Sequence, residues 1–461
     1  MSTEYLPTSS LPATDQRRRA RRRLLGGAVG TFVEWYDFLI YGLTVPIFAS
    51  QFFPGGDPTV ALLSTFAIFG VGFVVRPLGG ILFGYLGDRI GRIKVLAITI
   101  ILMGAATGLI GLLPVYEAVG VLAPLLLLLL RLVQGFSTGG EHSGALSFVV
   151  ESAPQHRRGF WIAIVYSVSI LPGVLLGFGL IGLRAALGEA AYMEWGWRLP
   201  FFLGAVLAVV GLWLRLRLSD PEEFTRAREE AGSENPLKTA VMKEWKSLLV
   251  VLVIIIPNLA GYYFLVTYMY SFAITTVGVS QELALLSNTI ASAVIMLGSL
   301  VGGRLADRVG RKPLMIAGAI WMALSSFPAL MLLSSGTAIG VITAQLVVAV
   351  GVTLYVSGAV VTMLELFRTS SRYSAHGLSY GVGTAIFGGA TPFVATWLAS
   401  NIGPVAPAII LVIAGLLSVI VLFFTPETRN VNLSSGAVAL NGDDEASAMA
   451  ATPATQERAR V

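Results

Sequence analysis

The chain carries one motif twice, as Gly84-Tyr-Leu-Gly-Asp88-Arg89-Ile-Gly91-Arg92-Ile-Lys94 and, about 220 residues later, as Gly303-Arg-Leu-Ala-Asp307-Arg308-Val-Gly310-Arg311-Lys312. Each copy connects two long apolar segments, and a connection repeated at matching places indicates a transporter built from two related halves. The glycines permit a tight turn, the aspartate can cap a helix or pair with arginine, and the basic residues suit an anionic membrane surface. One copy alone could be an ordinary basic turn, but two copies in register favour a functional role.

Apolar residues dominate the composition. Of the 461 residues, 55% are hydrophobic and 12% are charged, against about 25% charged residues in soluble domains, and the mean hydropathy is +0.78. Segments of the length that spans a bilayer, about 20 residues, lie near 24–49, 60–87, 93–113, 120–148, 160–183, 198–218, 247–275, 283–302, 313–334, 337–364, 374–400 and 404–425. We therefore predict an all-α membrane protein with twelve transmembrane helices in two pseudo-symmetric six-helix halves.

The basic residues predict the orientation of these helices. Lys and Arg gather in every second connection, beginning with the arginine cluster of residues 17–23, whereas the alternate connections carry almost none. By the positive-inside rule, both termini and the central loop face the cytoplasm, and an even number of spans requires the termini to lie on one side. We expect a multi-pass protein of the cell inner (plasma) membrane.

The same pattern divides the chain into five parts. They are a basic N-terminal segment (1–23), a first six-helix half (24–218), a central cytoplasmic loop (219–246), a second six-helix half (247–425) and a tail (426–461). The arginines of the first part suit lipid phosphates better than nucleic acid. The tail is rich in Ala, Ser and acidic residues and lacks heptads, so we expect it to be disordered.

Several classes of chemistry find no support in the sequence. There is no cysteine, so disulfides and cysteine-based metal sites are excluded. The histidines, His142, His156 and His376, are too far apart in sequence for a metal-binding motif. No nucleophile–base pair or nucleotide-binding loop stands out. We expect neither an enzyme nor a cofactor, with the proton as coupling ion and a monomer as the functional unit.

Ionisable residues within the predicted spans require a reason, because each costs about 2.5–3.5 kcal/mol at mid-bilayer. They concentrate in the first half, whereas Glu365 and Arg368 of the second half lie near a helix end. The positions in the first half are Glu34, Asp37, Arg76, Arg131, Glu141 and His142. We predict that Glu34, Asp37, Arg131 and Glu141 couple transport to protons, since buried acids in transporters are commonly proton relays. A purely structural salt-bridge network is the alternative.

Fixed positive charge and aromatic residues suggest what the site binds. Arg76 and Arg131 can bind a carboxylate through the guanidinium fork, while Arg198 can attract anions or anchor its helix. A quaternary ammonium would require an aromatic cage. The candidates for such contacts are Asn258, Tyr262, Tyr263, Tyr268 and Tyr270 on the seventh span and Tyr380 on the eleventh. Tyrosines in membrane helices also serve as packing or interface residues, so the sequence favours an anion or zwitterion without choosing between them.

Several stretches resemble one family. Val33-Glu34-Trp35-Tyr36-Asp37-Phe38, Arg76-Pro77-Leu-Gly-Gly80, Arg131-Leu-Val-Gln134-Gly135-Phe-Ser-Thr-Gly139-Gly140-Glu141 and Trp195-Gly-Trp197-Arg198-Leu-Pro200-Phe are similar to the metabolite:proton symporters of the major facilitator superfamily. The repeated motif resembles the loop 2–3 and loop 8–9 signature of that superfamily. The resemblance of the repeated motif implies a gating role for Gly84, Asp88, Arg89, Gly91 and Arg92, and for Asp307, Arg308, Gly310 and Arg311.

The resemblance also implies functions for particular residues. Glu34 and Asp37 match the paired acids of the first helix, and Arg131 matches the fourth-helix arginine linked to proton coupling. His142 stands where the family commonly has tyrosine, so we treat it as a substrate-contacting position whose contacts differ in this chain. Members of the family carry α-ketoglutarate, citrate, shikimate, proline or glycine betaine by alternating access driven by the proton gradient.

We therefore expect a proton symporter that imports a small carboxylate or zwitterionic metabolite. A proton-coupled exporter of metabolites or drugs and a non-transporting sensor on a transporter scaffold are the alternatives. The exporter is less favoured because the resemblance is to uptake systems, and the sensor because no signalling domain adjoins the helices.

Overall fold

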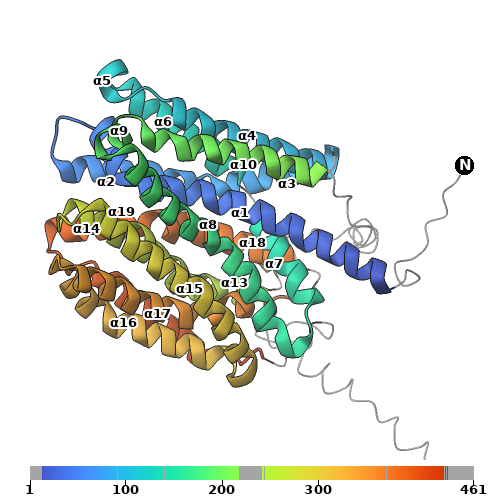
Figure 1. Ribbon diagram of the computed structural model, residues 1–461. Coiled ribbons are helices and arrows are strands. Elements are labelled where there is room, and N and C mark those ends of the chain that lie inside the picture. Colours follow the sequence, from blue (N-terminus) through green and yellow to red (C-terminus); the bar gives the residue numbers. More distant parts are fainter. Residues whose placement is uncertain are drawn as a thin grey trace, which may run out of the picture.

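The computed structural model is a bundle of long helices that run in roughly one direction (Figure 1). It describes residues 13–216 apart from 91, 139 and 140, and residues 241–433 apart from 243, 370, 430 and 432; no strand occurs among them. The helices of the first half are α1 (Ala13–Phe52), α2 (Pro58–Val74), α3 (Arg76–Ile90), α4 (Arg92–Leu112), α5 (Tyr116–Val119), α6 (Leu122–Ser137), α7 (Glu141–Ser152), α8 (Arg158–Leu187), α9 (Glu189–Glu194) and α10 (Leu199–Leu216). Short 3-10 turns, η2 (Gln155–Arg157) and η3 (Gly196–Arg198), precede α8 and α10.

The second half repeats this arrangement. Its elements are α13 (Trp245–Tyr263), η4 (Phe264–Met269), α14 (Tyr270–Thr275), α15 (Gln281–Val309), α16 (Arg311–Ser334), α17 (Ala338–Glu365), α18 (Arg372–Gly383), η5 (Thr384–Gly388), α19 (Gly389–Asn401) and α20 (Ala408–Phe424). Here η4 and η5 are π-helical segments within the seventh and eleventh spans.

The twelve predicted spans all correspond to apolar helical segments. In the part of the chain that the structure describes, nine helical segments are long and apolar enough to cross a membrane. Three shorter apolar helices, Ala97–Leu112, Leu122–Ser137 and Ala408–Phe424, coincide with the predicted third, fourth and twelfth spans. The all-helical, twelve-span prediction is confirmed. The first helix begins at Ala13 and so includes the arginine cluster, earlier than the predicted start of that span at residue 24.

Two predicted continuous spans are each built from two helices. The second span changes from α2 to α3 at Val75, next to Arg76-Pro77. Proline has no N–H to donate to the preceding turn, which explains a helix break there. The fourth span consists of α6 and α7, which end and begin at Ser137 and Glu141. Both breaks lie beside residues predicted to form the site.

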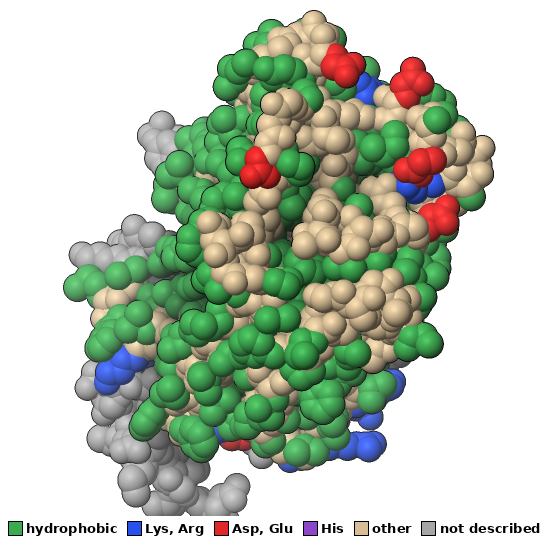
Figure 2. Space-filling model, turned by 90° about the vertical axis from the view of Figure 1, so that its left-hand side faces the viewer, with side chains coloured by type: hydrophobic (Ala, Val, Ile, Leu, Met, Phe, Trp, Pro, Cys, Tyr) green, Lys and Arg blue, Asp and Glu red, His purple; other side chains and the backbone are tan. Residues whose placement is uncertain are grey.

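The two halves lie side by side, with α8 of the first half along α15 of the second (Figure 1). We call the end of the bundle where α8 and α16 begin the inner end, which the sequence predicts to face the cytoplasm, and the opposite end the outer end. Charged side chains gather at the two ends, and a broad band of mostly hydrophobic side chains lies between them (Figure 2). This distribution fits a protein that spans a bilayer.

Glycines bring the halves into contact toward both ends. A methyl group at Gly389 of α19 would lie 2.4 Å from the Cα of Gly70 on α2, in the outer part of the bundle. At the inner end, a methyl group at Gly303 of α15 would lie 2.7 Å from the carbonyl oxygen of Gly159 on α8. Small residues permit such close helix approach in a membrane. The two halves are therefore closely packed at both of these places.

Candidate functional site

Among the acids of the first half whose side chains the structure describes, Asp37 on α1 is the most deeply buried, with 2% of its surface exposed. Its Oδ1 accepts hydrogen bonds from Thr107 Oγ1 on α4 and from Gln134 Nε2 on α6, the latter at 2.8 Å. Its Oδ2 accepts no hydrogen bond from the described residues. An incompletely bonded carboxylate is costly to bury in its charged form. Asp37 is therefore well placed to hold a proton.

Glu34 lies one turn before Asp37 and forms an ion pair with Arg76 at the start of α3. The distance from Arg76 Nη1 to Glu34 Oε1 is 3.7 Å. The guanidinium of Arg76 lies 3.8 Å from the ring centroid of Phe38 and 4.8 Å from that of Phe73. Aromatic faces stabilise a cation where water is excluded. This pair presents one positive and one negative group against aromatic rings.

Arg131 on α6 is fully buried beside the same rings. Its Nη1 donates to Gln134 Oε1 at 3.0 Å, so Gln134 connects Arg131 to Asp37. Its guanidinium lies 5.0 Å from the centroid of Phe38, on which Arg76 also packs. A methyl group at Gly72 would lie 2.9 Å from Arg131 Nη2, so glycine provides the space for this arginine. The structure thus brings the four predicted residues Glu34, Asp37, Arg76 and Arg131 together around Phe38. We call these four residues the central cluster.

The second half contributes aromatic residues to the central cluster. The ring of Tyr263 lies 5.2 Å from that of Phe73, and Tyr262 contacts Trp35 edge-on at 5.5 Å. The Tyr262 hydroxyl has no hydrogen-bond partner among the described residues. Asn258, one turn earlier on α13, is also buried. Tyr262 and Tyr263 of the predicted residues therefore contact aromatic rings of the first half.

Two further tyrosines of the prediction have ring neighbours in their own spans. Tyr268 packs against Phe264 and Phe272 of its own span, with ring centroids 5.0 and 5.5 Å away, and Tyr380 stacks on His376. The expectation that Tyr268 belongs to an aromatic cage at the centre is thus unsupported, because its neighbours on the same helix cover its ring. Some predicted side chains are not described by the structure: those of Glu141 and His142, and those of Asp88, Arg89 and Arg92 in the first motif. Of the glycines of that motif, Gly84 lies within α3, whereas Gly91 lies outside the described residues.

The seventh span leaves the regular helix directly after Tyr263. In the π-helical segment η4, Asn288 of α15 donates from Nδ2 to the carbonyl oxygen of Val266 at 2.9 Å. π-Helical turns frequently mark functional sites, and a side chain that bonds their carbonyl groups stabilises them. No proline or glycine lies within η4, so the sequence carries no signal for this irregularity.

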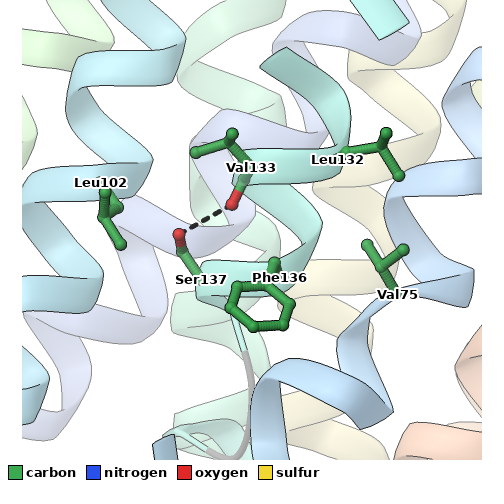
Figure 3. Close-up of a pocket in the computed structure, with 6 residues that line it drawn as sticks. All are labelled: Val75, Leu102, Leu132, Val133, Phe136 and Ser137. Carbon is green, nitrogen blue, oxygen red and sulfur yellow. Dashed lines mark hydrogen bonds between the residues drawn. The ribbon is translucent and has the colours of Figure 1, made fainter. Parts of the chain in front are cut away.

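An apolar pocket of about 370 Å³ lies on the other side of α6. Its lining residues are Val75, Leu102, Leu132, Val133, Phe136 and Ser137 (Figure 3). The Ser137 hydroxyl donates to the Val133 carbonyl oxygen of its own helix at 2.7 Å. Leu132 and Val133 face this pocket, whereas the preceding Arg131 is buried beside Phe38. The pocket is therefore separate from the central cluster.

The second copy of the motif joins the two halves at the inner end. Asp307 of α15 accepts hydrogen bonds from the backbone N–H groups of Gly159 and Phe160 at 2.8 and 2.9 Å. These N–H groups belong to the first turn of α8, where a carboxylate is favoured by unpaired donors and by the helix dipole. Arg311 pairs with Asp307 at 3.2 Å, while Arg308 is exposed.

Glu365 connects this contact to the rest of the inner end. This fully buried carboxylate lies 3.4 Å from Arg311 Nε and 3.8 Å from Nη1 of Arg158 in the first half. Thr428, beyond the last helix, donates to Glu365 Oε2 at 2.7 Å. The sequence places Glu365 near a helix end but does not predict its partners, which come from segments far apart in the chain. We call Arg158, Asp307, Arg311, Glu365 and Thr428 the inner cluster.

The segment after α20 covers the inner cluster. Glu427 accepts hydrogen bonds from the backbone N–H groups of Arg311 and Lys312, both at 3.0 Å, and so caps α16. Gly310 has φ of +117° at this junction, a conformation that favours glycine. Val431 accepts a hydrogen bond from Arg158 Nη1 at 2.7 Å. The beginning of the predicted tail is thus attached to both halves.

An arginine also links the halves at the outer end. Arg184 of α8 donates to Glu189 and to Gln281 at the start of α15. Its guanidinium lies 4.7 Å from the centroid of Tyr192, and the residue is 5% exposed. In the sequence, Arg184 is the one basic residue of its connection, which is a signal that could have singled it out.

Two family models match this chain. The model described as Major Facilitator Superfamily matches residues 27–298, and that described as Sugar (and other) transporter matches residues 222–438. The glycine betaine/proline/ectoine/pipecolic acid transporter OusA of Dickeya dadantii is 37% identical over 93% of this chain and 87% of its own length.

The chain belongs to the major facilitator superfamily.

Further relatives agree with this assignment. The α-ketoglutarate permease of Escherichia coli is 37% identical over 85% of this chain and 90% of its own, and the shikimate transporter of the same organism is 34% identical over 87% and 94%. Among solved structures, a proton:xylose symporter superposes with a TM-score of 0.70 at 20% identity, covering 89% of this chain and 97% of its own. These relatives are membrane transporters of small solutes, so the predicted family and class of function are confirmed.

Proposed function

We propose that this protein imports a small zwitterionic solute together with protons by alternating access. The observation that carries the proposal is the Glu34–Arg76 pair, with its atoms 3.7 Å apart beside Phe38 and Phe73. A zwitterion carries one charge of each sign, so its carboxylate can bind Arg76 while its ammonium faces Glu34 and the aromatic rings. A dicarboxylate would place two negative charges next to Glu34.

The surrounding residues support the same solute class. Tyr262, Tyr263 and Trp35 add aromatic surface next to the pair, as a quaternary ammonium requires. Asn258 lies one turn before Tyr262 and can bond a carboxylate. The relatives include a transporter named for glycine betaine, proline, ectoine and pipecolic acid. Two other relatives are named for shikimate and α-ketoglutarate, so transport of an organic anion is the alternative outcome of the uptake test.

Proton coupling is assigned to Asp37. When its carboxyl group is protonated, the uncompensated charge at Oδ2 disappears, which lowers the cost of burying Asp37 in the occluded state that carries the solute. Gln134 bonds both Asp37 and Arg131, so protonation of Asp37 changes the hydrogen bonding of the arginine that packs on Phe38. The proton is the only coupling ion in this proposal. The protein acts as a monomer in the cell inner membrane, with both termini in the cytoplasm.

Uptake into proteoliposomes tests the proposal. The panel is radiolabelled glycine betaine, proline, α-ketoglutarate and shikimate, each with an inward proton gradient, with a protonophore, or with a sodium gradient alone. We expect accumulation of glycine betaine or proline that requires the proton gradient. Accumulation of α-ketoglutarate alone would overturn the zwitterion assignment, and accumulation that persists with protonophore in a sodium gradient would overturn proton coupling.

A further inference from the structure

His376 lies on α18 in the second half, and its side chain is fully buried. Its Nδ1 is 3.0 Å from the hydroxyl oxygen of Ser143 on α7, in the first half. This hydrogen bond therefore crosses the boundary between the two halves, on the inner side of the central cluster. The sequence gives no reason to pair the two residues, which are 233 positions apart.

Three residues of α18 form a stripe that faces the first half. Arg372, His376 and Tyr380 are spaced four residues apart, so they share one face of the helix. Arg372 pairs with Glu151 near the inner end of the first half. Next along the stripe, His376 bonds Ser143. The stripe thus runs from the inner end toward the middle of the bundle.

Tyr380 continues this stripe to the central cluster. Its ring stacks on the imidazole of His376, with centroids 5.6 Å apart and planes inclined by 18°. Two turns further along the same span, a methyl group at Gly388 would lie 3.3 Å from the Tyr263 ring and 3.4 Å from the Phe73 ring, so this span reaches the aromatic residues beside the central cluster. A displacement of Tyr380 by a bound solute would therefore act directly on the imidazole that bonds the other half.

We propose that His376 is a positioning residue that connects occupation of the central cluster to opening of the inner end. The inference rests on the proposed function, because it requires a solute beside Tyr380. In the occluded state, the imidazole is held between the Tyr380 ring and the Ser143 hydroxyl. A solute that moves Tyr380 turns the imidazole away from Ser143, and the loss of this cross-half bond favours separation of α7 from α18.

The chain contains no cysteine, so a single introduced cysteine can report the opening. Ser147 lies one turn after Ser143 on α7 and is 6% exposed, so Ser147→Cys is shielded while the inner end is closed. Purified protein in nanodiscs is labelled with a maleimide, first without solute and then with saturating glycine betaine. The first measurement tests the hydrogen bond independently of transport and of the identity of the solute.

The variants separate the two contacts of His376. Ser143→Ala and His376→Phe remove the hydrogen bond, and phenylalanine keeps the ring on Tyr380. His376→Gln keeps a hydrogen-bonding group but removes the stacking. Ser379→Ala is the matched control, because the Ser379 hydroxyl donates to Ala375 of its own helix and makes no cross-half bond in the described structure.

We expect Ser143→Ala and His376→Phe each to raise the labelling rate without solute by roughly threefold to tenfold, as the loss of one buried hydrogen bond allows. Their combination should equal either single variant, since both remove the same bond. The control should label at the parent rate. In His376→Gln, glycine betaine should no longer change labelling, although it still binds.

Two results would overturn the proposal. One is labelling in Ser143→Ala and His376→Phe that equals the control, and the other is an additive effect in the double variant. Ser143→Ala removes a single oxygen atom, so the test stands even where a histidine variant fails to fold. Failure of the proposed function can be distinguished from failure of this inference. If the protein transports no member of the solute panel, Ser143→Ala and His376→Phe should still label faster than the control without solute.

Discussion

The central cluster and the inner cluster both bury a carboxylate among arginines, but they satisfy it differently. Glu365 has a partner at each oxygen: Arg311 Nη2 donates to Oε1 at 3.4 Å, and Thr428 donates to Oε2 at 2.7 Å. Asp37 receives hydrogen bonds from the described residues at Oδ1 alone. Partners at both oxygens favour the charged form of Glu365, whereas the unbonded Oδ2 of Asp37 supports the proton-coupling role proposed for that residue.

The clusters also differ in which half supplies the partners. Thr107 and Gln134, which bond Asp37, belong to the same half as Asp37, so their bonds can persist while the halves move relative to each other. Glu365 has Arg158 of the opposite half as a neighbour at 3.8 Å, and that contact must be lost when the inner end opens. Under the proposed function, the half that supplies the partners, rather than burial, distinguishes the coupling role of Asp37 from a gating role of Glu365.

The largest effect is expected for Asp37→Asn. Asparagine keeps an oxygen that can accept from Thr107 and Gln134 but cannot carry the coupled proton. We expect accumulation driven by a proton gradient to fall by at least about a hundredfold, consistent with loss of an essential proton-transfer group, while exchange of labelled for unlabelled solute continues. Counterflow and gradient-driven uptake, measured on one preparation, distinguish the two activities. Wild-type accumulation would show that Asp37 is structural.

Glu365→Gln should affect gating and leave coupling intact. Removing one partner of a buried ion pair costs about 3–5 kcal/mol where the remaining charge stays buried, so the closed inner end is strongly destabilised. We expect gradient-driven uptake to slow by about tenfold to a hundredfold, with an unchanged ratio of protons to solute. Parallel measurement of proton and solute fluxes provides the test. A changed ratio would move Glu365 into the coupling machinery and remove the distinction between the clusters.

Glu34→Gln sharpens the description of the central cluster. The substitution removes the negative charge beside Arg76 and keeps the size of the side chain. We expect the affinity for a zwitterion to fall by about tenfold, as loss of a charge-assisted contact allows, and the affinity for a dicarboxylate to rise. Equilibrium binding of glycine betaine and α-ketoglutarate to purified protein measures both. Equal losses for the two solutes would indicate a general packing defect.

The sequence predicts the residues of the central cluster because ionisable side chains are energetically costly inside a membrane span and are therefore rare there. An acid or an arginine inside an apolar span stands out, and the spacing of three between Glu34 and Asp37 already places them on one helix face. Hydropathy likewise predicts the number of spans, because each must cover the same bilayer thickness. Each of these signals lies within one segment of the chain, so the sequence of that segment is enough to detect it.

The contacts between the halves could not be predicted in this way. Ser143 and His376 are ordinary residues in their own helices, and their pairing arises from the packing of α7 against α18. The same holds for the N–H groups of Gly159 and Phe160, which any residue except proline could supply. In the sequence, the glycines at 159 and 303 indicate that the two helices can approach closely. The many other glycines in the spans make these two hard to recognise.

The smallest effect is expected for Asp307→Asn, in the motif copy that the structure describes. Asparagine can still accept one of the two N–H bonds from α8 but loses the charge that favours a helix N-terminus, so the cost is about 1 kcal/mol. Turnover should fall roughly fivefold with solute affinity unchanged. Glu282→Gln, which neutralises an exposed acid at the other end of α15, is the matched control. Asp88→Asn, whose side chain lies outside the described residues, is predicted to slow turnover more than Asp307→Asn. Because the contacts of Asp307 cross the halves, loss of intrinsic affinity with normal turnover in Asp307→Asn would contradict a gating role and separate this residue from the inner cluster.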